Sequence, residues 1–288
     1  MRVDISEFLI EPGKKLKLNN RPTTVRPICA SKDDYEKQLE KHVKQLDSLH
    51  QLLYGSNQFA LLVIFQGMDA SGKDGAIRHV MSGVNPQGCE VSSFKQPSSE
   101  ELEHDFLWRA EQRLPRRGSI GIFNRSYYEE VLVVRVHPEL LAAEGLAKDI
   151  TDKDVWEQRY QSIVNFEKHL HRNDTRVIKI FLHISKDEQR KRFVSRIDDP
   201  DKNWKFSMGD IQERKYWKQY MQAFEDCLEA TSTAHAPWYA VPADDKPNAR
   251  LIVSQIVVDA LSDLKMSYPK TTGKRKQELE SIRKALGK

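Results

Sequence analysis

Hydrophobic residues of this chain occur in two patterns: short continuous apolar runs, and longer stretches in which they recur every three or four positions. The clearest run covers 59–65 and is entirely apolar, which predicts a strand buried on both faces, as in the middle of a parallel sheet. Weaker runs of strand length follow along the chain. They predict strands over 89–94, 119–123, 176–184 and 238–241.

Helical periodicity fills the segments between these runs. Ser31 followed by Asp34 predicts a capped helix start, and the apolar positions that follow predict a helix that stops at Gly55. Further helices are expected from the turn after the first strand to residue 81, over 98–114, 151–170, from 185, 210–230 and 248–265, with a loop over 198–209. Strands that alternate with helices predict an α/β fold, a three-layer α/β/α sandwich around a parallel sheet.

The two ends of the chain lack this alternation. Residues 1–30, interrupted by three prolines, predict an irregular basic arm, and residues 266–288 predict a basic tail. The intervening residues 31–265 predict one domain, because a chain that is 39% hydrophobic can bury a sizeable core and no linker divides it. The basic ends are either solvated or form an electrostatic footprint for a polyanion, and charge alone does not decide between the two.

Composition also indicates the cellular setting. The three cysteines, Cys29, Cys89 and Cys227, are scattered without a CxxC pair and predict reduced thiols, not a disulfide framework or a zinc site. The longest apolar run is far shorter than the roughly 20 residues of a membrane-spanning helix, and the N-terminus lacks the hydrophobic core of a signal peptide. The sequence therefore predicts a cytoplasmic protein with no membrane partner.

The strongest chemical motif is the segment 67–75, Gly-Met-Asp-Ala-Ser-Gly-Lys-Asp-Gly, between the first predicted strand and a helix. It fits the G-x-x-x-x-G-K pattern, in which backbone amides, a helix N-terminus and a lysine bind phosphate. An ordinary glycine-rich turn is the plainer alternative, which the flanking strand and helix disfavour. The expected phosphate-binding residues of the loop are Ala70, Ser71, Gly72, Lys73 and Asp74.

Two acidic residues make this loop unusual. Asp74 stands where a serine or threonine normally contacts magnesium, and Asp69 lies inside the anion-binding loop itself. For Asp74, a role in metal binding and a role as a cap of the following helix are equally consistent with the sequence. For Asp69, the position favours metal binding or orientation of the nucleophile.

A second group of polar residues follows the predicted strand 119–123. Arg125 is placed to bind phosphate oxygens with its planar fork, beside Asn124 at the strand end. Glu129 and Glu130 lie one helical turn further on and either supply negative charge to a metal or are solvated surface residues.

Single cations elsewhere extend this picture. Lys95 follows the end of another predicted strand, and Arg196 lies with several other cations in the helix that begins at Ser185. Taken singly, each would ordinarily be a surface residue. Together, on elements that flank the same edge of the sheet, they indicate a phosphate-lined channel.

The chain resembles the polyphosphate kinase 2 family over most of residues 30–265, through the phosphate loop and five further segments. These segments are Phe94-Lys-Gln-Pro-Ser-Ser99, Phe123-Asn-Arg-Ser-Tyr-Tyr-Glu-Glu-Val131, Arg196-Ile-Asp-Asp-Pro200, Trp204-Lys-Phe-Ser207 and Thr231-Ser-Thr-Ala-His-Ala-Pro-Trp-Tyr-Ala-Val-Pro242. The set is far more specific than a phosphate loop alone. Asn124 departs from the aspartate found in much of the family, and Asn-Arg-Ser-Tyr-Tyr-Glu resembles the class III branch, which uses both nucleoside mono- and diphosphates.

This resemblance implies a thymidylate-kinase-like P-loop fold with a helical lid at about 190–220. It implies phosphoryl transfer between inorganic polyphosphate and nucleotides, from AMP to ADP and from ADP to ATP, with Mg²⁺ or Mn²⁺ as cofactor. The implied roles are catalysis by Asp69, Lys73, Arg125 and Arg196, polyphosphate binding by Lys95, nucleotide binding by Asn124, Arg125 and Glu129, and metal binding by Asp69 and Glu130.

Two other functions are consistent with the motifs. The first is an ATP-dependent nucleoside monophosphate kinase, which would be expected to carry a hydroxyl residue at position 74. The second is a nucleotide-binding module without turnover that acts through its basic ends. The expected partners are polyphosphate and nucleoside phosphates, not nucleic acid, together with further copies of the chain in a dimer or tetramer.

Overall fold

The apolar runs that predict strands all lie in one parallel sheet, with strand order β2-β3-β1-β4-β5. The structure, a computed structural model, describes residues 2–144 and 152–287. The strands are β1 (Ala60–Gln66), β2 (Cys89–Ser93), β3 (Ile120–Asn124), β4 (Thr175–His183) and β5 (Trp238–Pro242). Every strand predicted from the sequence is confirmed, with ends that shift by at most one residue.

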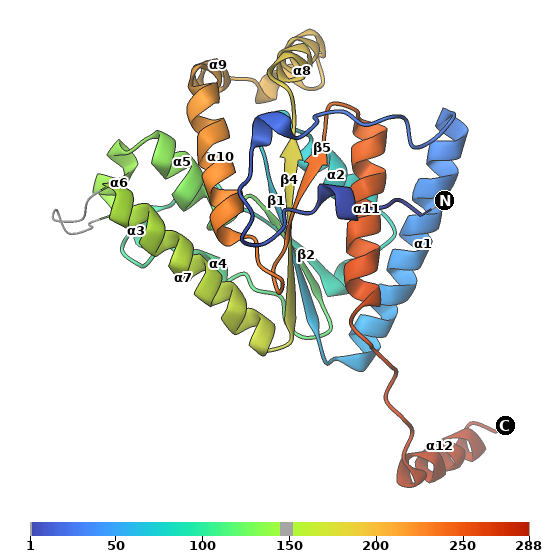
Figure 1. Ribbon diagram of the computed structural model, residues 1–288. Coiled ribbons are helices and arrows are strands. Elements are labelled where there is room, and N and C mark those ends of the chain that lie inside the picture. Colours follow the sequence, from blue (N-terminus) through green and yellow to red (C-terminus); the bar gives the residue numbers. More distant parts are fainter. Residues whose placement is uncertain (1, 145–151, 288) are drawn as a thin grey trace.

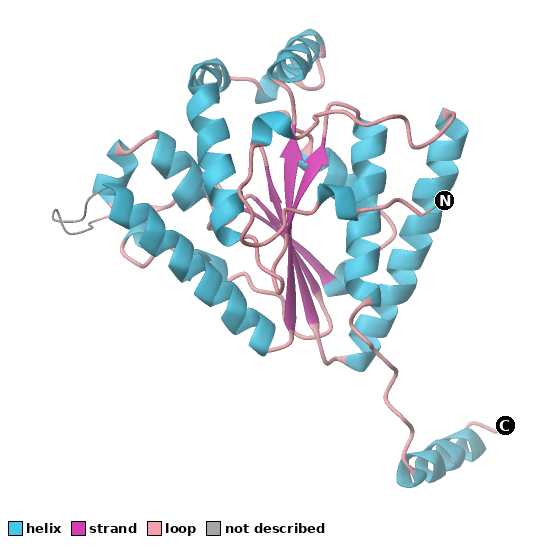
Figure 2. Ribbon diagram, viewed as in Figure 1, coloured by secondary structure: helices cyan, strands magenta, loops and turns pink. Residues whose placement is uncertain are grey.

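Helices cover both faces of this sheet, as Figures 1 and 2 show. On one face α1, α2 and α11 pack on Leu61, Val63 and Phe65 of β1, and on the other α5, α7 and α10 pack on Leu62 and Ile64. Successive side chains of a strand point to opposite faces, so a continuous apolar run is what a sheet covered on both sides requires. The predicted three-layer α/β/α sandwich is confirmed.

Most predicted helix starts carry the expected caps. The side chain of Ser31 accepts a hydrogen bond from the amide of Asp34 at the start of α1, and Ser185 does the same for Glu188 at the start of α8. The helices are α1 (Lys32–Ser56), α2 (Lys73–Val80), α3 (Ser99–Leu102), α4 (Trp108–Glu111), α5 (Glu129–Val136), α6 (Glu139–Ala143), α7 (Asp152–Arg172), α8 (Lys186–Asp198), α9 (Met208–Glu213), α10 (Trp217–Thr231), α11 (Lys246–Ser262) and α12 (Gly273–Ala285). Short 3₁₀ turns, η1 to η5, lie at Ser6–Phe8, Leu18–Asn20, Pro86–Gly88, Asn203–Lys205 and Arg214–Tyr216.

Three helix predictions were wrong in detail. The helix expected over 98–114 is divided into α3 and α4, because the carboxylate of Asp105 accepts the amide of Leu107 in a turn. The helix expected over 210–230 starts earlier, at a capping box formed by Ser207, and is divided by η5. The first helix continues past Gly55 to a left-handed cap at Asn57. The helix start predicted at Thr151 lies outside the described residues.

The N-terminal segment has no helix longer than a 3₁₀ turn, yet it packs against the core. The amide of Ile10 donates to the carbonyl of Trp238 in β5, and the amide of Leu16 donates to Glu229 in α10. The buried apolar side chains of this segment are Val3, Phe8, Ile10, Leu16 and Leu18. At the other end, α12 projects away from the body of the molecule (Figure 1). Among the described residues, no helix combines the length and apolarity needed to span a bilayer.

A buried ion pair forms hydrogen bonds with the segment that follows β3 and fixes its position. Lys179 of β4 and Glu167 of α7 are fully buried, with 2.5 Å between the ammonium and carboxylate groups. The hydroxyl groups of Tyr127 and Tyr128 donate to the same carboxylate at 2.9 and 2.8 Å. A buried charge is tolerated when its partners satisfy it, and here these partners fix the chain directly after Arg125.

Candidate phosphate-binding site

The phosphate loop runs from the carboxyl end of β1 into α2, at the strand between β3 and β4. The strands β3 and β2 lie on one side of β1, and β4 and β5 lie on the other. The order of strands therefore changes direction at β1, and such a position is the usual ligand site of open α/β sheets. Gly67, Ala70 and Gly72 have positive φ angles of 150°, 61° and 105°. A side chain on Gly67 would lie 2.8 Å from the carbonyl oxygen of Leu182, so this position requires glycine.

Lys73, the first residue of α2, bends back over the loop. Its ammonium group donates to the carbonyl of Gly67 at 2.7 Å and to that of Met68 at 3.3 Å. Burial, followed by the nearby charge of Arg125, lowers the pKa of Lys73 to about 8. The lysine predicted to contact phosphate therefore lies inside the loop. An anionic ligand bound there would accept the hydrogen bonds that its ammonium group now donates to the two carbonyl groups.

Arg125 reaches the same loop from the end of β3. Its guanidinium donates to the carboxylate of Asp69 at 2.7 Å and lies 3.6 Å from that of Glu129. The backbone of Arg125 has a φ of 64°, unusual for a residue with a side chain, while its amide bonds to Phe65 of β1. Such strain is typical of functional sites, and here it turns the arginine toward the loop. The two groups predicted from separate motifs thus share one site.

Asn124 and Asp74 form a second contact between the two motifs. The side-chain amide of Asn124 donates to the carboxylate of Asp74 at 2.7 Å. Glu129 completes the group: burial raises its pKa, although Arg125 and Lys73 act in the opposite direction. The site thus combines the cations Lys73 and Arg125 with several carboxylates.

Three predicted site residues lie apart from this group. Glu130 points into the interior, where its carboxylate accepts from Arg109 at 2.8 Å, and burial raises its pKa to about 7. Lys95 is exposed just after the end of β2. Its backbone carbonyl, not its side chain, accepts a hydrogen bond from Arg109. Arg196 is half-exposed on α8 and forms no hydrogen bond or ion pair with residues 2–144 and 152–287. Within residues 2–144 and 152–287, none of these three side chains forms a hydrogen bond or ion pair with the phosphate loop.

Comparison with known proteins identifies the family. A family model described as polyphosphate kinase 2 matches residues 29–269. The chain belongs to this family. The resemblance inferred from the sequence motifs is therefore confirmed.

Relatives of this polyphosphate kinase 2 family member match between 78% and 99% of its length. It is 57% identical over 287 residues to the ADP-polyphosphate phosphotransferase of Rhodopseudomonas palustris, and the match covers 99% of each chain. It is 47% identical over 226 residues to the AMP/ADP-polyphosphate phosphotransferase of Meiothermus ruber, covering 78% of this chain and 80% of the relative. The crystal structure of polyphosphate kinase 2 from Arthrobacter aurescens TC1 matches with a TM-score of 0.85 at 37% identity, over 96% of this chain and 99% of that one.

Residues that the sequence motifs did not distinguish also contact the loop of this polyphosphate kinase 2 family member. Ser71, which the loop motif did predict, has a buried hydroxyl with no hydrogen-bond partner among the described residues, as expected of a group that binds a polar ligand. Gln189 and Arg192 of α8 bond to loop carbonyl groups. In the sequence, Arg192 is one of several cations in this helix, and only its burial in the fold separates it from the others.

The loop carboxylates fit a magnesium ion, which the family resemblance implies. Asp69 and Asp74 offer oxygen atoms beside the phosphate loop, and Mg²⁺ typically uses one or two carboxylates with water and substrate phosphates. Among the described residues, no three His, Cys, Asp or Glu side chains are grouped to hold a metal alone. Glu130 is bonded to Arg109 instead, so its position does not support the predicted metal role.

The pKa of Lys73 predicts an alkaline limit on activity. In the free protein this lysine carries its charge below pH 8 and loses it above, because burial lowers its pKa to about 8. We expect kcat/KM, which reports on the free enzyme, to fall about tenfold per pH unit above this pKa. When polyphosphate is saturating, the fall in kcat should begin at a higher pH, because bound phosphate stabilises the charged ammonium form of Lys73. A kcat/KM that stays flat to about pH 10 would contradict the assignment.

Proposed function

We propose that this protein transfers phosphoryl groups reversibly between inorganic polyphosphate and nucleoside phosphates, with both AMP and ADP as acceptors. The contact that carries the proposal is the 2.7 Å bond between Arg125 and Asp69, which joins the end of β3 to the phosphate loop. The names of relatives support the substrates, ADP-polyphosphate in one case and AMP/ADP-polyphosphate in another. Asn124 in place of the common aspartate supports the class III assignment, and hence the use of AMP as well as ADP.

The chemistry requires positioning and charge neutralisation. An oxygen of the acceptor's terminal phosphate attacks the terminal phosphorus of polyphosphate, and the bond to the next phosphate breaks. The nucleotide gains one phosphate and the polymer loses one. Because the attacking oxygen is already anionic and the transition state is loose, no strong general base is needed. Lys73 and the loop amides hold the transferring group, and Arg125 binds its oxygens from the opposite side.

Magnesium is part of the proposal, with manganese as a substitute of similar oxygen preference. When bound, the metal would neutralise charge on the phosphate chain. Asp69 and Asp74 are the residues we propose to hold it, because both lie at the loop, and their contacts with Arg125 and Asn124 orient them. Lys95 and Arg196 remain proposed contacts for the polyphosphate chain beyond the loop, since both side chains are accessible to a ligand.

A matrix of donors and acceptors tests the proposed function. Purified protein with Mg²⁺ should convert AMP to ADP and ADP to ATP with polyphosphate as donor, and be at least about tenfold slower with ATP as the donor to AMP, the reaction of a monophosphate kinase. Product nucleotides are separated and quantified by chromatography. Absence of ADP and ATP with polyphosphate would refute the proposal, and equal rates with ATP would favour the monophosphate kinase.

The cellular setting and assembly complete the proposal. A cytoplasmic location is supported by the three cysteines, which are all free thiols as expected in a reducing compartment. Assembly into a dimer or tetramer is the second expectation, through the exposed side of α1. Light scattering of the purified protein measures it directly.

A further inference from the structure

Two side chains of α8 bond to three consecutive carbonyl groups of the phosphate loop. Gln189 donates to the carbonyl of Asp69 at 2.9 Å, and Arg192 donates to those of Ala70 and Ser71 at 3.0 and 2.9 Å. Gln189 and Arg192 are three residues apart, so they share one face of the helix. Both are buried against the loop.

The guanidinium of Arg192 is fully occupied by the protein. Besides its two loop carbonyls, it donates to the carbonyls of Ala243 and Asp244 after β5, at 2.6 and 2.9 Å, and to the carboxylate of Glu188 at 2.9 Å. Each of the five N–H groups of an arginine thus has one acceptor here. The cation therefore has no donor left for a phosphate, and its contribution to phosphate binding must be indirect.

The bonded carbonyls determine where the loop amides point. In a planar peptide the C=O and N–H groups point in opposite directions. With the carbonyls of Asp69 and Ser71 held against α8, the amides of Ala70 and Gly72 are directed to the other side, toward the phosphate position, while the amide of Ser71 donates to the carbonyl of Met68 at 3.0 Å. Ala70 has a left-handed φ angle of 61°, which a residue with a side chain keeps only when surrounding contacts enforce it, whereas glycine at position 72 adopts its φ of 105° freely. The bonds from α8 are such contacts.

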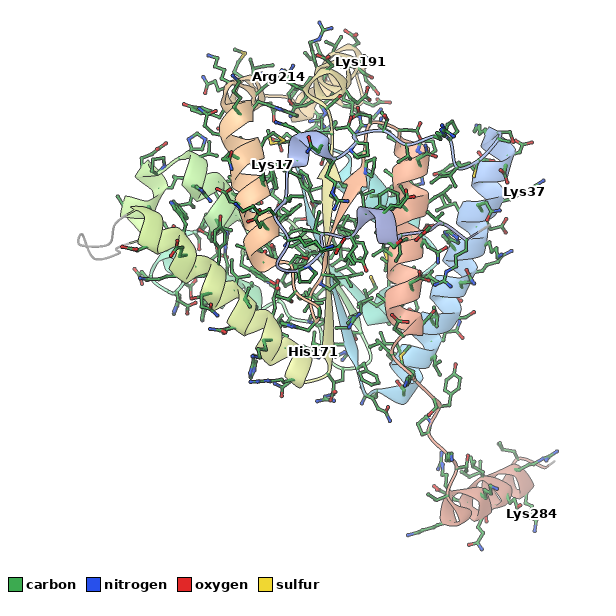
Figure 3. The ribbon with its side chains drawn as sticks, in the orientation of Figure 1. Lys17, Lys37, His171, Lys191, Arg214 and Lys284 are labelled. Carbon is green, nitrogen blue, oxygen red and sulfur yellow. The ribbon has the colours of Figure 1, made fainter. Side chains whose placement is uncertain are left out.

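The same contacts connect the loop to η5, in the part of the predicted lid that follows α8. Arg214, in η5 between α9 and α10, donates to the side-chain oxygen of Gln189 at 2.8 Å and to the carbonyl of Lys186 at 2.7 Å. Figure 3 labels Arg214 at the top of α10 and Lys191 on α8. One side chain, Gln189, therefore bonds the lid on one side and the phosphate loop on the other.

We propose that Gln189 and Arg192 are positioning residues that hold the phosphate loop in its anion-binding conformation and couple it to the lid. The inference rests on the proposed function for its kinetic readout. Gln189 and Arg192 act on the loop backbone and touch neither the polyphosphate nor the nucleotide. Their loss weakens phosphate binding and slows transfer because the amides of Ala70 and Gly72 are no longer held toward the phosphate position.

Kinetics and anion binding of matched variants test this. Arg192→Met should lower kcat about 100-fold and Gln189→Met about tenfold, each with weaker tripolyphosphate binding by calorimetry without nucleotide. Arg192→Lys should recover little, because an ammonium group cannot bond four carbonyls in a plane. The exposed Arg172, at the end of α7, provides the control: Arg172→Met should keep wild-type kcat and affinity.

Thermal unfolding separates positioning from stability. A purely structural role would lower the unfolding temperature while the folded fraction kept wild-type kcat and tripolyphosphate affinity, and that result would overturn the proposal. If Arg192→Met does not fold, Gln189→Met decides, because it leaves every bond of Arg192 in place; wild-type behaviour of this variant would also overturn the proposal. Tripolyphosphate binding needs no turnover, so it tests the loop even if the wild-type protein proved inactive with polyphosphate.

Discussion

Replacement of Lys73 by methionine is expected to lower kcat about 1,000-fold or more with polyphosphate as donor. The ammonium group lies inside the loop, 2.7 Å from the carbonyl of Gly67, where it can transfer to phosphate oxygens without moving far. Methionine fills similar space and removes the charge, so the loss reports on electrostatic stabilisation rather than on packing. Initial rates at saturating AMP and ADP measure the effect.

A matched lysine variant controls for this change. Lys168 is exposed on α7, so Lys168→Met should retain wild-type turnover. A binding module without turnover predicts a different result. In that case the wild-type protein would show no turnover, and Lys73→Met would still bind nucleotide. Measurable turnover near the wild-type level in Lys73→Met would contradict the catalytic role.

Arg125→Ala is expected to lower kcat by about 100- to 1,000-fold, with a smaller effect on the KM of the acceptor. The guanidinium lies 2.7 Å from Asp69, and it can bind two oxygens of a transferring phosphoryl group at once. Arg125→Lys should recover only part of the loss, because an ammonium group keeps the charge without the planar fork. Rates with AMP and with ADP should fall by the same factor.

The control for the arginine variant is Arg113→Ala, at an exposed position before β3. It removes the same charge away from the loop and should leave the rates unchanged. Since alanine tolerates the left-handed φ of 64° no better than arginine does, backbone strain is matched between wild type and Arg125→Ala. Full turnover of Arg125→Ala would be incompatible with the proposed mechanism.

Local patterns were sufficient to predict most of the fold. The apolar run at 59–65 became β1 because both of its faces are covered, and the caps at Ser31 and Ser185 start helices where expected. The phosphate loop could be predicted because its glycines, lysine and flanking elements are consecutive in sequence. Arg125 could be placed beside it because carboxyl ends of parallel strands meet at one edge of the sheet.

Contacts between distant segments could not be predicted in this way. Glu130 follows Glu129 directly, yet the helix turns it away from the loop toward Arg109, a contact that neither motif encodes. Arg192 and Gln189 are separated from the loop by 122 and 120 residues in their bonds to Ala70 and Asp69. Only the packing of α8 against the loop shows that these side chains, rather than Arg196, bond to it.

The N-terminal segment has a consequence for how the protein is made. Its amide at Ile10 pairs with Trp238, and the amide of Leu18 bonds to Glu225, partners that leave the ribosome more than 200 residues later. Until these partners are synthesised, the apolar side chains of the segment, including Phe8, lack the complete core surface against which they are buried in the folded protein. This segment, synthesised before its partners, is thus among the last to fold into place, and its antiparallel bridge from Leu9 to Tyr239 then occupies part of the outer edge of β5.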